Sequence, residues 1–193
     1  MAHTLNMFED YVKVFTLLFD RLPRGRRLGV VSNAGFECAS VLDKLYALEP
    51  AVLSDATRAR LRERLPGIAH ADNPVDTTPM ATTAQLVAAA AALLEDPGVD
   101  ALLVSPIPVS PALEKLAPDL AGSHSENICA TGSLPQELIR PFRETRKPMA
   151  VVGVAHRAPV ERPASSGGRA SRRRKPGRRR ENTSRSPDSR TWR

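Results

Sequence analysis

A short polar segment, Ser32-Asn33-Ala34-Gly35, is the first place where this sequence offers a binding chemistry. It follows the largely apolar run 27–31 and precedes a helical pattern, so we expect it between the carboxyl end of a strand and the amino end of a helix. Open α/β sheets bind ligands at that edge, and the backbone N–H groups of a helix N-terminus favour an anion such as phosphate or carboxylate. The segment is neither a dinucleotide-binding nor a Walker glycine loop. The alternative is a tight turn, in which Gly35 takes an unusual backbone angle and Asn33 bonds to loop amides.

A second polar segment, residues 73–79, reads Asn-Pro-Val-Asp-Thr-Thr-Pro. Its two prolines stiffen the backbone, and Asn73, Asp76, Thr77 and Thr78 supply side-chain oxygens close together in the sequence. A ligand-binding loop or a subunit contact needs such a rigid polar segment. A structural turn that pins a strand edge through Asx-type hydrogen bonds needs it equally. Both interpretations stay open.

No complete set of catalytic residues is visible, and we assign none. Cys38 lies in an apolar helical pattern and is expected to be a small core residue, while Cys129 has no histidine near it in the sequence. No Cys/His spacing typical of zinc occurs, so we assign no metal ligands either. The four histidines have no carboxylate at a revealing spacing, and we expect them at the surface: His3, His70, His124 and His156.

Residues 8–22 predict an amphipathic helix that contains half of the aromatic side chains. Phe8, Phe15 and Phe19 recur with leucine, valine and tyrosine at spacings of three and four, the period of a helix with one apolar stripe. Such a stripe usually packs against a core, and we expect that here.

Further helical patterns alternate with short, nearly continuous apolar runs, which favours a parallel sheet covered by helices on both faces. This alternation predicts one α/β domain over residues 5–154, with Pro141 kinking or shortening its last helix. The expected helices are 36–48, 54–66, 83–95, 111–120 and 134–145, and the expected strands are 27–31, 99–104 and 149–154.

The charge is divided between two parts of the chain. Residues 156–193 hold 13 Lys and Arg against 3 Asp and Glu, whereas the first 155 residues carry a net charge of −3. The basic pI of about 10.1 therefore belongs to the end of the chain and does not indicate that the folded part binds nucleic acid. No secretory signal and no run of the roughly 18 apolar residues needed for a membrane span is present, so we expect a cytoplasmic protein.

Residues 155–193 are rich in Arg, Ser, Pro and Gly and have too few apolar residues to form a core, so we expect a disordered tail. The basic clusters 172–175 and 178–180 would bind a polyanion non-specifically and with strong salt dependence. A functional nucleic-acid arm, a solvated tail without a role, and out-of-frame translation of GC-rich DNA are the three interpretations.

Four motifs in order resemble one known family. They are Ser32-Asn33-Ala34-Gly35 after a strand, a helix that runs from Leu53-Ser54 to Leu65-Pro66, Asn73-Pro74-Val75-Asp76, and Asp96-Pro97-Gly98-Val99-Asp100-Ala101. Over residues 8–153 the chain resembles the NDP-forming (ADP-forming) acyl-CoA synthetases, relatives of succinyl-CoA synthetase.

The resemblance implies a flavodoxin-like α/β subdomain with a parallel sheet, and an acid–thiol ligase reaction in the complete enzyme. Complete enzymes use CoA and ATP/ADP and contain a CoA-binding domain, a phosphohistidine subdomain and an ATP-grasp domain, which we expect as partner domains or subunits. No histidine of this chain matches the family's phosphohistidine context. The family pattern would also continue beyond Val154, so we expect an incomplete subdomain.

We therefore expect a fragment or subunit of an NDP-forming acyl-CoA synthetase that is inactive alone. Two alternatives stay open. One is a non-catalytic, flavodoxin-like binding or regulatory domain, and the other is a nucleic-acid-associated protein that acts through its basic tail.

Overall fold

The computed structural model describes residues 2–107, 110, 113, 123 and 125–152. The chain divides into two units, Met1–His156 and Arg157–Arg193, and every described residue belongs to the first. The expected helix 111–120 and the basic tail 155–193 therefore lie outside the described residues, apart from position 113.

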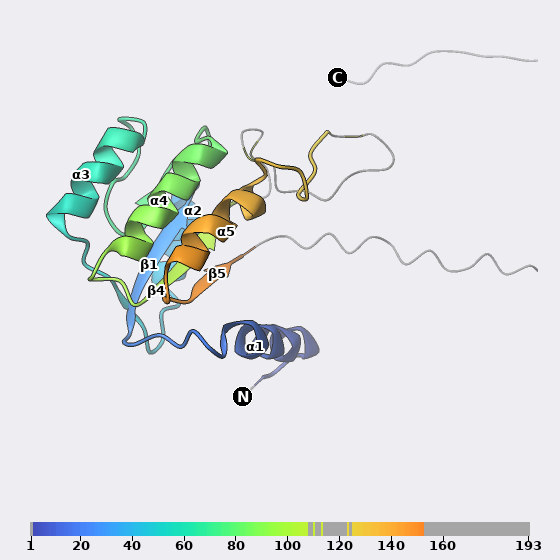
Figure 1. Cartoon of the computed structure of the whole chain (residues 1–193). Helices are drawn as coiled ribbons and strands as arrows, with labels where there is room; N and C mark the ends of the chain where they lie inside the picture. Colours follow the sequence, from blue (N-terminus) through green and yellow to red (C-terminus); the bar gives the residue numbers. More distant parts are fainter. Residues whose placement is uncertain (1, 108–109, 111–112, 114–122, 124, 153–193) are drawn as a thin grey trace, which may run out of the picture. The chain divides into compact units, whose positions relative to one another are not determined.

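A parallel sheet forms the centre of the described unit (Figure 1). The central strand β1 pairs with β4 from Leu28 to Ser32, and β4 pairs with β5. On its other edge β1 pairs with β2 at its start and with β3 at its end, so β2 and β3 share one edge. The strands are β1 (Arg27–Ser32), β2 (Glu49–Pro50), β3 (Val75–Asp76), β4 (Ala101–Ser105) and β5 (Met149–Val151).

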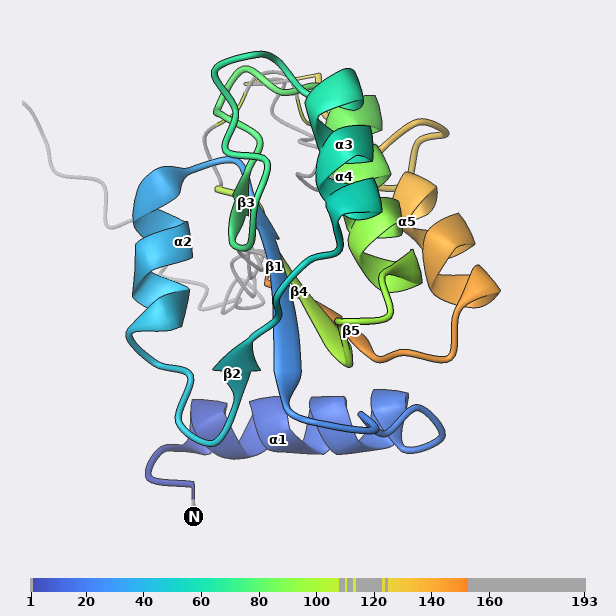
Figure 2. The ribbon, with the colours of Figure 1, turned by 90° about the vertical axis from the view of Figure 1, so that its left-hand side faces the viewer.

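Helices cover both faces of this sheet (Figure 2). One face carries α2, and the other carries α3, α4 and α5, with α4 packed between α3 and α5. The α/β fold with a parallel sheet covered on both faces is thereby confirmed. The helices are α1 (Leu5–Leu18), α2 (Gly35–Leu42), α3 (Asp55–Arg64), α4 (Thr83–Glu95) and α5 (Leu134–Glu144).

The core lies between the sheet and the α3–α4–α5 layer. Helix α4 begins with a capping box, in which Thr82 and Gln85 bond to each other's backbone N–H groups. Its apolar face buries Leu86 and Leu93 against Val31 and Leu102 of the sheet. Gly29 allows this packing, because a side chain there would press against Leu93.

Several boundaries differ from those expected. The helix predicted over 36–48 ends at Leu42, because the chain then turns so that Glu49 can pair with Arg27 at the sheet edge. The two-residue strands β2 and β3 were not predicted, since two residues are too few to show a strand pattern. Helix α5 continues three residues past the buried Pro141.

The prediction that the first helix packs in the core is wrong. Helix α1 buries none of its residues, and Phe15 and Phe19 are 69% and 73% exposed. The helix lies across the amino ends of the strands, away from both covered faces (Figure 2). Arg21 holds the chain where it leaves α1. Its guanidinium donates to the backbone carbonyls of Phe142 and Thr145 at 2.7 Å and lies 4.1 Å from the Phe142 ring centroid.

Replacing Phe8 and Phe15 together by serine is expected to change the free energy of unfolding by less than about 1 kcal/mol, because exposed side chains contribute little to stability. Leu86→Ala, a fully buried position, should cost about 2–5 kcal/mol and provides the control. Urea unfolding followed by circular dichroism measures both. A loss of similar size in the two variants would show that the α1 face packs in the core.

Candidate functional site

The two polar segments singled out in the sequence meet at the carboxyl end of β1. The register pairs Ser32 with Asp76, and the Thr77 backbone N–H and hydroxyl both donate to the Ser32 carbonyl, at 2.8 and 3.1 Å. Ser105 at the end of β4 lies opposite Ser32. We call this group, Ser32–Gly35 with Asp76–Thr78, Glu37 and Ser105, the carboxyl-end cluster.

Ser32 and Asn33 are fully buried, and their polar atoms hold the cluster together. The Ser32 hydroxyl donates to the Ser105 carbonyl at 2.6 Å and accepts from the Ala34 N–H at 3.2 Å. Asn33 Oδ1 accepts from the Ile107 N–H at 2.8 Å, but its Nδ2 has no partner among the described residues. A buried donor without an acceptor costs about 1–3 kcal/mol, so it marks a place where an acceptor would be bound favourably.

The amino end of α2 opens onto the same cluster. Ala34 is its N-cap and makes no side-chain capping bond, so the first N–H groups of the helix are left for another acceptor. Two carboxylates lie beside them. Glu37 Oε2 accepts from the Ser105 hydroxyl at 3.1 Å, and Asp76 is so near Gly35 that an added Cβ there would lie 3.1 Å from Asp76 Oδ2.

Those carboxylates limit what the turn can hold. A fully ionised phosphate chain would gain from the helix N-terminus but would be repelled by Glu37 and Asp76. A group that accepts from the turn and also donates a proton, such as the hydrogen phosphate ion, suits both. Glu37 and Ser105 were not predicted at this site from the sequence. Ser105 could have been found, because it ends an apolar strand as Ser32 does.

Thr78 is held in a strained conformation at this edge. Its φ of 74° lies in the left-handed region, which is costly for a β-branched residue. Its N–H donates to Asp76 Oδ1 at 2.9 Å, while its buried hydroxyl has no partner in the described part of the chain. Backbone strain and an unpaired buried hydroxyl at the same residue indicate that threonine at position 78 does not stabilise the fold.

Thr78→Gly is expected to raise the free energy of unfolding by about 0.5–1 kcal/mol, because glycine adopts this φ freely and the unpaired hydroxyl disappears. Thr77→Gly is the neighbouring control and should destabilise, since Thr77 bonds to the Ser32 carbonyl through its hydroxyl. Thermal unfolding of both variants gives the comparison. A destabilised Thr78→Gly protein would contradict the strain argument.

Asn73 belongs to the sheet and not to the carboxyl-end cluster. Its Oδ1 accepts from the Val30 N–H at 2.8 Å, and its Nδ2 donates to the carbonyls of Leu28 and Ala51 at 2.9 and 3.0 Å. The side chain thereby fills the gap between β2 and β3 on the edge of β1. Its amide hydrogens are both used, so it has none left to offer a ligand.

The described histidines and cysteines do not form a catalytic set. His3 and His70 are exposed, and the Nδ1 atom of His70 lies 3.1 Å from the Pro74 carbonyl oxygen. Burial and the nearby Asp76 carboxylate raise the pKa of the Cys38 thiol to about 11, which keeps it protonated and unreactive. His124 and His156 lie outside the described residues. Within the described ranges no group of three or more His, Cys, Asp or Glu residues could hold a metal ion.

Comparison with known proteins finds similarity to an ADP-forming CoA ligase. No family model matches the chain. Acetate–CoA ligase [ADP-forming] II subunit alpha of Pyrococcus furiosus is 32% identical over 130 residues, which is 66% of this chain and 27% of that protein. The resemblance to ADP-forming acyl-CoA synthetases is thereby confirmed, and this chain is similar to a segment of one of their subunits.

Solved structures show the same fold. The crystal structure of PH0766 from Pyrococcus horikoshii OT3 has a TM-score of 0.60 at 28% identity and matches 79% of this chain. The dinucleotide-forming acetyl-coenzyme A synthetase 1 of Ca. Korarchaeum cryptofilum, solved with phosphate and ADP, has a TM-score of 0.62 at 22% identity and matches 78%. This chain spans 27% of the P. furiosus subunit and 33% and 29% of the two solved chains.

Proposed function

We propose that this chain supplies the flavodoxin-like domain of an ADP-forming acyl-CoA synthetase and takes part in acid–thiol ligation only together with further domains. The observation that carries the proposal is the 32% identity over 130 residues to an ADP-forming acetate–CoA ligase subunit. The parallel sheet and the cluster at its carboxyl end support it, because that edge is where α/β sheets bind their ligands.

We assign CoA and ATP/ADP to partner domains of the CoA-binding and ATP-grasp types. The carboxyl-end cluster of this chain does not suit a nucleotide's ionised phosphate chain, because Glu37 and Asp76 flank the N-terminus of α2. What it suits is a single acceptor group that also carries a proton. In this proposal the carboxyl-end cluster holds such a group during the ligation reaction. The chain acts in the cytoplasm together with its partner domains.

We place the contact with a partner domain on the apolar side of helix α1. Its polar residues gather on one side, and the apolar arc around Phe8, Tyr11 and Phe15 is exposed. Exposed apolar patches of this kind mark protein contacts. The acyl substrate's own binding residues are expected in the partner domains.

A chimera tests the proposal. The matched segment of the P. furiosus subunit is replaced by residues 2–152 of this chain, and ADP- and phosphate-dependent release of CoA from acetyl-CoA is measured with the complementary subunit present. We expect activity within about tenfold of the parent enzyme and none from this chain alone. A folded, assembled but inactive chimera would contradict the synthetase proposal and favour the alternative of a binding or regulatory domain.

Two variants of the chimera separate the contributions. Phe8→Ser with Phe15→Ser should abolish assembly while leaving the fold intact, as judged by size-exclusion chromatography and circular dichroism. Arg140→Gln, an exposed position on α5 whose ion pair among the described residues is with Glu144, is the control and should assemble normally. Normal assembly of the phenylalanine variant would remove α1 as the docking face.

A further inference from the structure

A cavity of about 300 Å³ opens at the amino ends of β1, β4 and β5, at the opposite edge of the sheet from the carboxyl-end cluster. Its walls come from the loops that enter these three strands. We call it the amino-end cavity, and the residues that matter for its chemistry are Leu22, Arg24, Asp100, Thr145, Arg146 and Lys147.

The one acidic side chain of this wall is already neutralised. Asp100 accepts from Arg27 Nε and Nη2, both at 2.8 Å, and from the Arg27 backbone N–H at 3.0 Å. Both carboxylate oxygens are therefore engaged by a guanidinium that does not line the cavity. The cavity wall therefore carries a net positive charge from three side chains: Arg24, Arg146 and Lys147.

These cations are available to a ligand. Within the described part of the chain, neither Arg24 nor Arg146 has a carboxylate at ion-pair distance. Lys147 Nζ donates to the Asp96 main-chain carbonyl, which uses one of its three hydrogens. Burial lowers the pKa of Lys147 against the opposing effect of Asp96 and Asp100, so an anion beside the ammonium group would favour its charged form.

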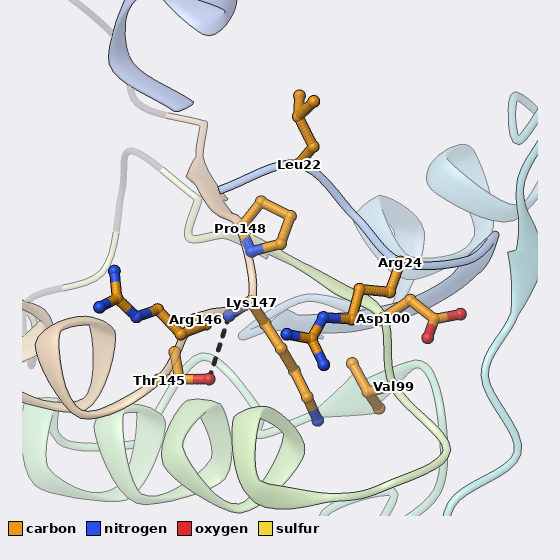
Figure 3. A pocket seen from close by; sticks show the side chains of 8 residues that line it. All are labelled: Leu22, Arg24, Val99, Asp100, Thr145, Arg146, Lys147 and Pro148. Carbon is orange, nitrogen blue, oxygen red and sulfur yellow. Dashed lines mark hydrogen bonds between the residues drawn. The ribbon is translucent and has the colours of Figure 1, made fainter. Parts of the chain in front are cut away.

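The backbone is shaped to bring Arg24 to this place. Gly25 lies directly against the Asp100 carboxylate, and any side chain there would collide with it. The loop before β1 can therefore run close over the entrance to β4. Figure 3 shows Arg24 and Lys147 extending across the cavity, while Arg146 at its rim points away from them.

We propose that the amino-end cavity binds a small polyanion of the diphosphate class, held by Arg24 and Lys147, with Arg146 at the rim. The volume lies at the lower end of the range for small-molecule pockets, roughly 300–1,000 Å³, so it suits a compact ligand. The donors reach the cavity from two loops and different directions, which matches tetrahedral phosphate groups better than one planar carboxylate. This site is separate from the one invoked in the proposed function, and neither depends on the other.

Calorimetric titration of the full chain with pyrophosphate at 150 mM salt tests the proposal. The wild type should bind one equivalent in the cavity. Arg24→Gln should weaken this binding by about tenfold, and Arg146→Gln by about threefold. Both residues are exposed and without a described partner, so the variants should fold normally. Arg24→Lys should retain most of the affinity lost in Arg24→Gln.

The controls separate the cavity from the basic tail and from other anions. Arg140→Gln removes an exposed arginine outside the cavity and should bind as the wild type does. Every variant keeps the basic clusters of residues 169–180, so their non-specific binding is common to all. Citrate in place of pyrophosphate distinguishes a carboxylate ligand from a phosphate ligand, and tighter binding of citrate would overturn the assignment. Equal pyrophosphate affinity in all variants, or no saturable binding by the wild type, would overturn the cavity as a site.

Discussion

Asn73→Ala is expected to lower the free energy of unfolding by about 3 kcal/mol, because a single amide serves three backbone groups and each buried group that loses its partner costs about 1–3 kcal/mol. The Leu28 carbonyl keeps its bond from the Ala51 N–H, so the Val30 N–H and the Ala51 carbonyl carry most of this cost. The losses should not add in full, since water can reach a partly buried residue. Val30, Leu28 and Ala51 lie on the central strand or next to its neighbour β2. The variant should therefore loosen the sheet edge and not only the loop.

Asn127→Ala is the matched control for this experiment. Asn127 Oδ1 accepts a single bond, from the Cys129 N–H at 2.9 Å at the surface, so its loss should cost less than about 1 kcal/mol. Urea unfolding of the two variants measures the difference. Equal destabilisation would mean that the three bonds of Asn73 contribute no more than one surface turn.

Asp100→Asn is expected to lower the midpoint of thermal unfolding at neutral pH by roughly 3–6 °C. The substitution removes the charge from the hydrogen-bonded ion pair with Arg27, and a loss of this kind shifts the midpoint by several degrees in a domain of this size. The hydrogen bonds from Arg27 hold the pKa of Asp100 at about 2, well below its usual value near 3.8. The partial exposure of Arg27 reduces the effect through solvent screening.

The stabilisation that the Arg27–Asp100 pair provides depends on pH. Because the folded state lowers the pKa, the pair contributes its full stabilisation above the unfolded pKa of about 4 and loses it as the pH falls through about 2. Wild type and Asp100→Asn should therefore differ most above pH 5 and converge toward pH 2. Midpoints measured between pH 7 and pH 2.5 test this, and a difference that stays constant over the range would show that charge is not its cause.

The helical patterns were the most informative part of the sequence about the fold. The helices predicted over 54–66 and 83–95 form, with Ser54 and Thr82 as their N-caps, and the apolar strands before Ser32 and Ser105 lie side by side in parallel. Local preferences and periodicity are read directly from neighbouring residues, so these elements could be predicted from one sequence. The boundaries at Leu42 and Glu49 could not, because pairing with Arg27 sets them.

The candidate site was predictable in composition but not in arrangement. Ser32–Gly35 and Asp76–Thr78 meet as carboxyl ends of parallel strands must, whereas Asn73, only three residues from Asp76, points its amide into the sheet. Nothing in the spacing of the segment 73–79 distinguishes these roles. The flanking carboxylate of Glu37 depends on how α2 leaves β1, which is a tertiary property.

Helix α1 shows the same division. Its sequence by itself determined that a helix forms and that one side of it is apolar, since both follow from local periodicity. Whether that side is buried depends on which surface lies against it, and only the tertiary structure decided that none of the described elements covers it. The amino-end cavity is a stronger case. Arg24, Asp100 and Lys147 are far apart in the sequence, and they are joined only because parallel strands bring the loops before β1, β4 and β5 to one edge.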